Sequence, residues 1–92
     1  MYDTNRWRPT ATTAFRQGAF EFWVNTRETE YEPPHVHIWF ADAGTEARIT
    51  LTTSDWMDKQ PPKAAQGIQI FLERREELVA LWNKIHTNRQ VQ

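Results

Sequence analysis

The chain has 92 residues and a net charge of −1, with 11 basic against 12 acidic side chains. This length suits one small domain over 1–92 with a modest core, and the balanced charge excludes the basic excess typical of a general nucleic-acid binder. The sequence contains no cysteine, which excludes a disulfide framework and a thiolate metal site. No apolar run reaches the length of a membrane span, so we expect no membrane contact, and the absence of cysteine suits a cytosolic protein.

The first half of the chain predicts an antiparallel meander of strands. After a polar N-terminal arm over 1–11, we expect strands over 12–16, 20–26, 35–40 and 46–51, separated by turn residues such as Gly18 and Gly44. Alternate side chains of a strand share a face. The predicted apolar face consists of Phe20, Phe22, Val24, Val36, Ile38, Phe40, Ala47, Ile49 and Leu51.

The second half predicts helix, because apolar residues recur at helical spacing from Pro62 to His86. A straight helix of this length would be roughly 37 Å long, whereas a domain of this size has a radius of gyration of only about 12 Å. The helix must span the domain, overhang it or break, and the charged run 73–77 is the expected break. Residues 87–92 are expected to form a polar tail. The predicted fold class is α+β, a small antiparallel sheet of three or four strands with a long or broken C-terminal helix on one face.

The stretch 33–37, Pro-Pro-His-Val-His, is the most informative motif of the chain. Two prolines impose an extended approach to the third strand, and the period of two then places His35 and His37 on the face opposite the apolar one. The neighbouring strands add acidic, basic and aromatic groups to this outer face. Its full predicted set is Glu21, Trp23, Asn25, His35, His37, Trp39, Glu46, Arg48 and Thr50.

Two functional interpretations use most of this set. An acid–base site acting on RNA would move protons through imidazole and carboxylate groups and would steady a phosphate with a cation. Its catalytic groups would be His35, His37, Glu21 and Arg48. In that site, Trp23 or Trp39 would also stack a base. A binding surface for a protein partner would use aromatic and polar anchors instead. These anchors would be Trp23, Trp39, Asn25 and Glu46.

A third interpretation is a metal site, since two imidazoles from a His-x-His pair can bind one zinc ion when a carboxylate such as Glu21 or Glu46 completes the ligand set. The pattern does not specify that third ligand, so we expect no metal and no other cofactor. If a metal binds, its ligands include His35 and His37. In a purely structural interpretation, the two histidines are half-buried and hydrogen-bonded, and outward tryptophans, with Trp7, cover the outer face.

The order of these elements resembles a prokaryotic family of domains of unknown function described as DhiT-type toxins of type II toxin–antitoxin systems. The resemblance covers about residues 10–86 and rests on the stretch 33–37 and on Trp82 near the end of the helix. It implies a small cytoplasmic protein with a cognate antitoxin protein, and it assigns no catalytic residue. The leading hypothesis is therefore a toxin-like protein acting on RNA or the ribosome. The sequence leaves its oligomeric state undecided, with a homodimer as one option. The alternatives are a non-catalytic protein-binding module and a metal-dependent small enzyme.

Overall fold

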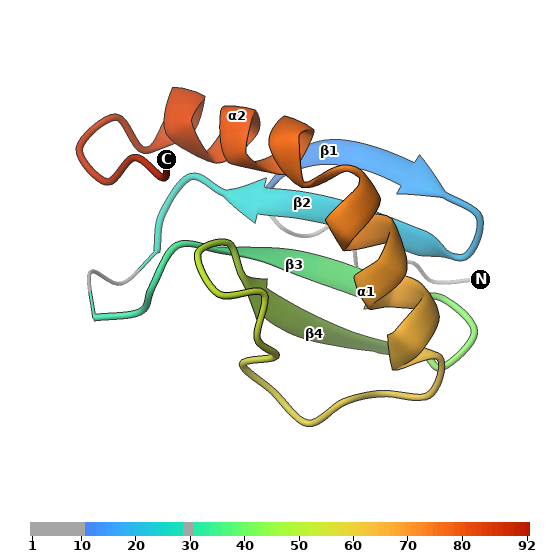
Figure 1. The fold of residues 1–92 in the computed structure, drawn as a ribbon. Helices are drawn as coiled ribbons and strands as arrows, with labels where there is room; N and C mark the ends of the chain where they lie inside the picture. The colour runs from blue at the N-terminus through green and yellow to red at the C-terminus, as the bar shows by residue number, and fades with distance from the viewer. Residues whose placement is uncertain (1–10, 29–30) are drawn as a thin grey trace.

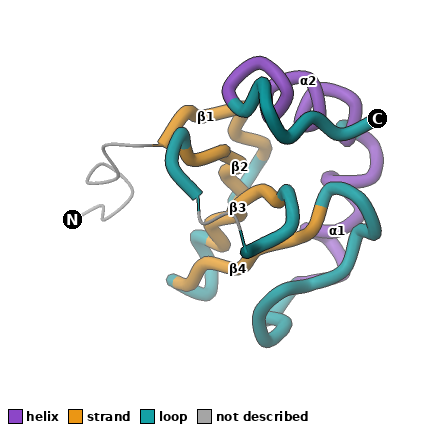
Figure 2. The backbone as a smooth tube through the Cα atoms, turned by 90° about the vertical axis from the view of Figure 1, so that its left-hand side faces the viewer, coloured by secondary structure: helices purple, strands orange, loops and turns teal. Residues whose placement is uncertain are grey.

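The structure, a computed structural model, describes residues 11–28 and 31–92. Its strands are β1 (Ala11–Gln17), β2 (Phe20–Asn25), β3 (His35–Phe40) and β4 (Thr45–Thr50), and its helices are α1 (Ala64–Glu73) and α2 (Arg75–Ile85). The strands form one antiparallel sheet in the order β1-β2-β3-β4, and both helices lie on one face of it (Figure 1 and Figure 2). The predicted α+β fold is confirmed.

Alternation along the strands separates the two faces of the sheet as expected. Phe22 pairs with Ile38, which pairs with Ala47, and all three side chains are fully buried on the helix side. On the opposite, outer face Trp23 pairs with His37, which pairs with Arg48. The central strands therefore divide an apolar core from a polar layer.

The helical segment breaks at Arg74, inside the predicted run 73–77. The backbone of Arg74 has a φ of −118°, and its guanidinium lies 3.5 Å from the ring centre of Phe15 while also binding Glu77. The next residue, Arg75, donates from Nε to the carbonyl of Leu51 at 2.9 Å. The break lets α1 cross the sheet while α2 lies along β1 and β2 (Figure 1).

The helix begins two residues later than the expected start at Pro62. Lys63 has a φ of 67°, in the left-handed region, so helical geometry is first reached at Ala64. The ammonium of Lys63 binds the carboxylate of Asp42 at 2.6 Å, which joins this start to the turn between β3 and β4.

Residues 87–92 fold back along α2, although their composition suggests only a polar tail. The indole N–H of Trp82 donates to the carbonyl of Arg89 at 2.7 Å. Asn83 accepts from the backbone N–H of Val91 at 2.7 Å and donates to its carbonyl at 2.8 Å. Because these bonds bring Val91 into the core, where it is 7% exposed, the segment is a packed part of the fold.

The connection between β4 and α1 runs along the edge of β4. The N–H of Met57 donates to the carbonyl of Arg48 at 2.8 Å, and the N–H of Thr50 donates to the carbonyl of Asp55 at 2.9 Å. Trp56 forms an isolated bridge with Ile49 and packs against the core. This connection supplies partners for backbone groups that an edge strand would otherwise leave open.

The contact between α1 and the sheet predicts a sensitive glycine. A Cβ at Gly67 would lie 2.8 Å from Cζ of Phe40, whose buried ring is held by Phe20 and Trp56. Overpacking costs about 1–3 kcal/mol, which exceeds the roughly 1 kcal/mol that alanine gains over glycine in a helix. Gly67→Ala should therefore lower the free energy of unfolding by about 1 kcal/mol in urea titration. Gln66→Ala, an exposed neighbour in the same helix, should change it by under about 0.5 kcal/mol, and a stabilised Gly67→Ala would contradict this packing.

Candidate functional site

The outer face carries a group of five polar side chains, which we call the histidine cluster. His35 and His37 come from β3, Glu46 from β4, Asn25 from the end of β2, and Glu28 from the loop that follows it. The two imidazoles have centroids 5.0 Å apart, and His37 stacks on the indole of Trp23 at 5.1 Å. The cluster is buried, because His35 is 0% and His37 is 6% exposed.

Glu28 lies at the centre of the histidine cluster. Its Oε2 is 2.8 Å from Nε2 of His37 and 3.1 Å from Nε2 of His35, and its side chain is 9% exposed. The contact with His37 is a hydrogen bond, whereas the approach to His35 lacks hydrogen-bond alignment. Glu28, His35 and His37 each offer one ligand atom, and these atoms all lie within 4.8 Å of one another. These three residues are thus the set that could hold a metal ion.

The far side of each imidazole has a hydrogen-bond acceptor. Nδ1–H of His35 donates to the carbonyl of Pro33 at 2.8 Å, and Nδ1–H of His37 donates to Oε2 of Glu46 at 3.0 Å. A carbonyl or carboxylate oxygen can only accept, so these partners assign the Nδ1 proton in both rings. Nε2 of each ring therefore faces Glu28.

Asn25 adds a fourth group to this centre. The indole N–H of Trp23 donates to its Oδ1 at 3.1 Å, and this contact orients the amide. The amide nitrogen of Asn25 then lies 3.2 Å from Nε2 of His37. Nε2 of His37 thus contacts an amide donor and a carboxylate acceptor at once. The amide N–H needs a ring nitrogen without a proton, whereas the carboxylate needs one that carries a proton.

The electrostatics of the cluster follow from burial and from opposite charges. Burial by itself raises the pKa of Glu28, but the neighbouring imidazoles His35 and His37 outweigh it and hold that pKa at about 2. Burial lowers the pKa of His37, and its hydrogen bonds to Glu28 and Glu46 outweigh this effect, so the net shift is upward. In the metal-free protein, the arrangement favours an ionised glutamate beside a protonated His37.

Arg48, on the rim of the cluster, is held by two carboxylates. Its guanidinium binds Asp58 through Nε at 3.0 Å and Nη2 at 2.9 Å, and Glu32 through Nη1 at 2.6 Å. The Arg48 backbone N–H also donates to Asp58 at 3.0 Å. The predicted phosphate-binding cation therefore already has acidic partners, and it fastens two loops beside the cluster.

The other predicted site residues lie around the cluster rather than in it. Glu21 binds Arg16 at 3.1 Å and accepts from Thr13 at 3.3 Å, so it is directed toward β1. Trp39 lies between Glu21 and Glu46 in the strand register and is half-buried. Trp23 is fully buried, so its indole presents no face on which a base could stack. Trp7 lies outside the described residues.

Sequence reasoning missed Glu28. The carboxylates considered as partners for the His-x-His pair were Glu21 and Glu46, and Glu46 contacts the Nδ1 side of His37 while Glu21 faces β1. Glu28 sits in an irregular loop, where a period of two assigns no face. The acidic character of this loop was a usable signal. The loop returns the chain from the end of β2 to His35, so its glutamates were candidates to lie close to the histidines.

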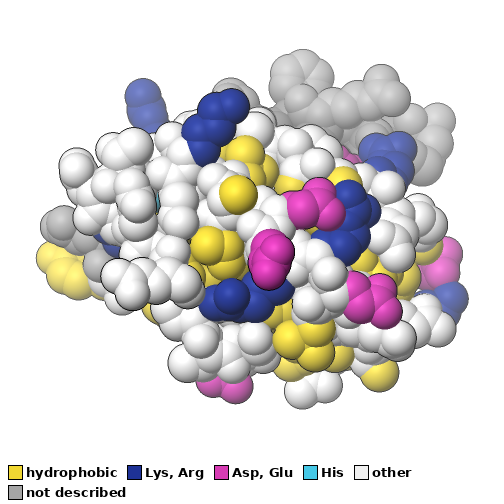
Figure 3. All heavy atoms as spheres, turned by 45° about the horizontal axis from the view of Figure 1, so that its top comes forward, with side chains coloured by type: hydrophobic (Ala, Val, Ile, Leu, Met, Phe, Trp, Pro, Cys, Tyr) yellow, Lys and Arg dark blue, Asp and Glu magenta, His cyan; other side chains and the backbone are white. Residues whose placement is uncertain are grey.

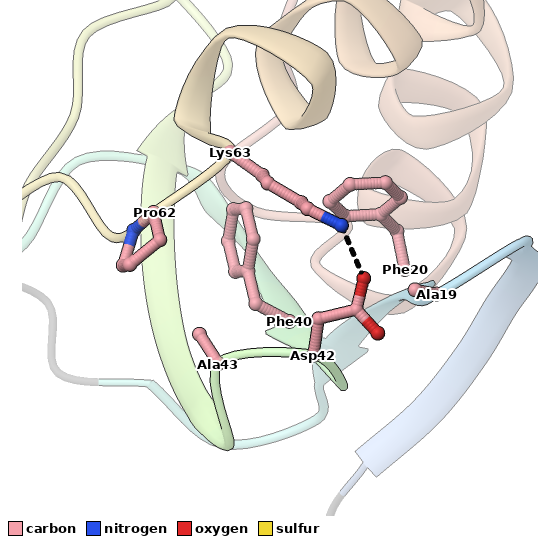
Figure 4. Close-up of a pocket in the computed structure, with 7 residues that line it drawn as sticks. All are labelled: Ala19, Phe20, Phe40, Asp42, Ala43, Pro62 and Lys63. Atoms are coloured by element: carbon pink, nitrogen blue, oxygen red, sulfur yellow. Dashed lines mark hydrogen bonds and ion pairs between the residues drawn. The ribbon is translucent and has the colours of Figure 1, made fainter.

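A cavity of about 180 Å³ lies at the opposite end of the sheet from the cluster. Figure 4 shows Phe20 and Phe40 forming its walls and Lys63 reaching across to Asp42. Figure 3 shows acidic and basic side chains interspersed over the face around α2. Among the described residues, this face lacks the basic track that a nucleic-acid backbone favours, and the histidine cluster on the outer face of the sheet is the candidate site that we pursue.

The fold and the cluster define a small α+β protein with a buried His–Glu–His group. This chain belongs to the family described as Domain of unknown function (DUF4160), whose model matches residues 19–83. The match includes all five residues of the histidine cluster, and it ends just after Trp82. The comparisons with curated proteins and with solved structures found no match. Within the described residues, no helix is both long and apolar enough for a membrane span.

The Arg48–Asp58 contact predicts acid-sensitive stability. The Arg48 guanidinium, ahead of an opposing effect of burial, holds the pKa of Asp58 below its usual range. The stabilisation is therefore present above the unfolded-state pKa of about 3.9 and is lost as the pH falls through the lower folded-state value. Both side chains are partly solvated, so Asp58→Asn should cost only about 1 kcal/mol at neutral pH and should flatten the fall in unfolding free energy below about pH 4.

Urea titrations between neutral and acidic pH measure both effects. Asp55→Asn removes the same charge from the same connection without breaking the contact with Arg48, and we expect it to cost less. An Asp58→Asn variant with wild-type stability at neutral pH and an unchanged acid slope would show that this contact contributes nothing.

Proposed function

We propose that the protein is a toxin-like component of a prokaryotic type II toxin–antitoxin pair, with the histidine cluster as its active centre and RNA or the translation machinery as its target. The resemblance carried by the stretch 33–37 and by Trp82 motivates the proposal. The cytoplasm is the compartment that this target requires, and a cognate antitoxin is the expected partner.

The single observation that carries the proposal is the burial of Glu28 between two imidazoles in a small domain. Removing one partner of such a buried pair typically costs about 3–5 kcal/mol, a large share of the roughly 5–15 kcal/mol that stabilises a whole domain. Apolar residues would fill the same volume at less risk to folding. Buried charged groups that lower the stability margin of a fold, in place of apolar packing, concentrate at functional sites.

In this proposal, one imidazole or carboxylate group accepts the proton of an RNA 2′-hydroxyl that attacks the adjacent phosphorus, and another donates a proton to the 5′-oxygen that leaves. Glu46 is the most accessible member of the three ion pairs of the cluster, with a side chain that is 43% exposed, so substrate would approach from β4. Arg48 would order the rim through Glu32 and Asp58 rather than bind the phosphate directly, because both carboxylates already hold it.

A second candidate is a non-catalytic module that holds a protein partner. Tyr31 is 93% exposed and lies in the loop that also supplies Glu28. A large aromatic ring in solvent is a typical interface anchor. Under this alternative, the cluster would serve to shape the loop, and a stoichiometric partner would bind without any effect of the protein alone on growth.

Expression from a tightly repressed promoter in a bacterial host tests the two functions. The wild-type chain should inhibit growth, and Glu28→Gln/His37→Gln should relieve the inhibition, since it removes the central acid and base while leaving no unpaired buried charge between them. His86→Gln is the matched control, because its amide N–H can still donate to the carbonyl of Asn25, as His86 does at 2.8 Å.

The control should remain inhibitory, and circular dichroism should show the double variant folded. Absence of inhibition by the wild-type chain would reject the toxin. Full inhibition by the double variant would reject the cluster as its centre. If the double variant does not fold, His37→Gln alone is scored by the same criterion.

A further inference from the structure

Three electron-rich atoms converge at the middle of the histidine cluster. Nε2 of His35 and Nε2 of His37 both lie within 3.1 Å of the same oxygen of Glu28. The Nδ1–H groups donate to the Pro33 carbonyl and the Glu46 carboxylate, so each Nε2 presents its lone pair whenever its ring is neutral. Two lone pairs and a carboxylate oxygen repel one another unless a cation lies among them.

A single proton satisfies only part of this arrangement. Placed on Nε2 of His37, it forms the 2.8 Å hydrogen bond to Glu28 but faces the amide nitrogen of Asn25 at 3.2 Å. Nε2 of His35 keeps no aligned hydrogen-bond partner among the described residues, although this side chain is 0% exposed. A buried ring nitrogen left in this state is costly, and it points into the same centre.

We propose that Glu28, His35 and His37 bind one divalent transition-metal ion of the zinc class. Two imidazole nitrogens and one carboxylate oxygen suit ions of intermediate softness, whereas Mg²⁺ and Ca²⁺ prefer oxygen ligands alone. Ligand atoms about 2.0–2.1 Å from a tetrahedral ion lie about 3.3 Å from one another. The present separations of 2.8 and 3.1 Å from Glu28 need to open by only a few tenths of an ångström.

The surroundings of the two histidines match those of metal ligands. A metal-bound histidine usually donates its other ring N–H to a backbone carbonyl or a carboxylate, which fixes the ring and makes it a better donor to the metal. Pro33 supplies the carbonyl for His35, and Glu46 supplies the carboxylate for His37. Glu46 is thus a positioning residue, and the two prolines that precede β3 place the Pro33 carbonyl.

Three protein ligands leave a fourth tetrahedral position for water or another small oxygen ligand. Asn25 lies beside the ligand set, with its amide nitrogen oriented by Trp23 and 3.2 Å from Nε2 of His37. The inference goes beyond the proposed toxin function and does not require it, because metal uptake is measured on the purified protein. A metal-binding chain that leaves growth unaffected would reject the toxin and keep the metal site.

The test uses the full chain purified without a histidine tag and stripped with a chelator. Zn²⁺ titrated by calorimetry should bind saturably, with one ion per chain, and should raise Tm by about 10–20 °C at a 100-fold excess over Kd. Co²⁺ should bind at the same place and give the visible absorption of a four-coordinate nitrogen and oxygen site. Weak binding without a fixed stoichiometry, or no rise in Tm, would overturn the proposal.

Variants assign the ligands. Glu28→Gln should weaken Zn²⁺ binding by at least about 10-fold and abolish the Co²⁺ spectrum, and Glu46→Gln should weaken binding by about 10-fold to 100-fold while keeping one ion per chain. His86→Gln removes the third histidine, which stacks on Trp82, and should leave the affinity unchanged. Unchanged affinity in folded Glu28→Gln would overturn the assignment. If that variant does not fold, the stoichiometry and the Co²⁺ spectrum of the wild-type chain decide whether the chain holds one metal ion.

Discussion

The pairing of Trp23 with His37 across β2 and β3 is the contact on which both layers of the molecule depend. The two rings stack with an interplanar angle of 17°, and their strands place Phe22 and Ile38 back to back with them on the helix side. A slip of one residue would move the apolar side chains of β3 outward and its histidines inward. The same pairing register of β2 and β3 thus places both the core side chains and the cluster side chains, and neither set can be placed correctly without the other.

The loop between β2 and β3 is held from several directions, which explains how an irregular segment can place a buried carboxylate. Glu28 is fixed by the imidazoles, and the side chain of Glu32 is bound by Arg48 while its carbonyl accepts from Arg89. Arg89 in turn belongs to the C-terminal segment that Trp82 ties to α2. The helices cover the opposite face of the sheet, yet the end of α2 and the residues after it secure the loop beside the cluster.

The periodicity of apolar residues predicted the features that depend on neighbouring residues in the chain, namely the two faces of the sheet and the helical segment. The alternation in β2, β3 and β4 correctly separated the two faces. The helical pattern was too long for a domain of this size, and the charged run 73–77, named as the expected break, contains the break at Arg74. Glu28 and the packed residues 87–92 were missed, because their positions depend on contacts between segments far apart in the chain. The alternation also assigned Trp23 to the correct face without revealing that its indole is wholly covered, since a face does not determine exposure.

The connection that follows β4 has a consequence for assembly. An exposed outer strand can recruit a strand from a second molecule, which leads to sheet extension or aggregation. Here the backbone groups of Arg48 and Thr50 are already bonded to the connection, and Asp58 binds both the backbone and the guanidinium of Arg48. Continuation of the sheet past β4 would require breaking these bonds, so a homodimer of this protein would have to form through another surface.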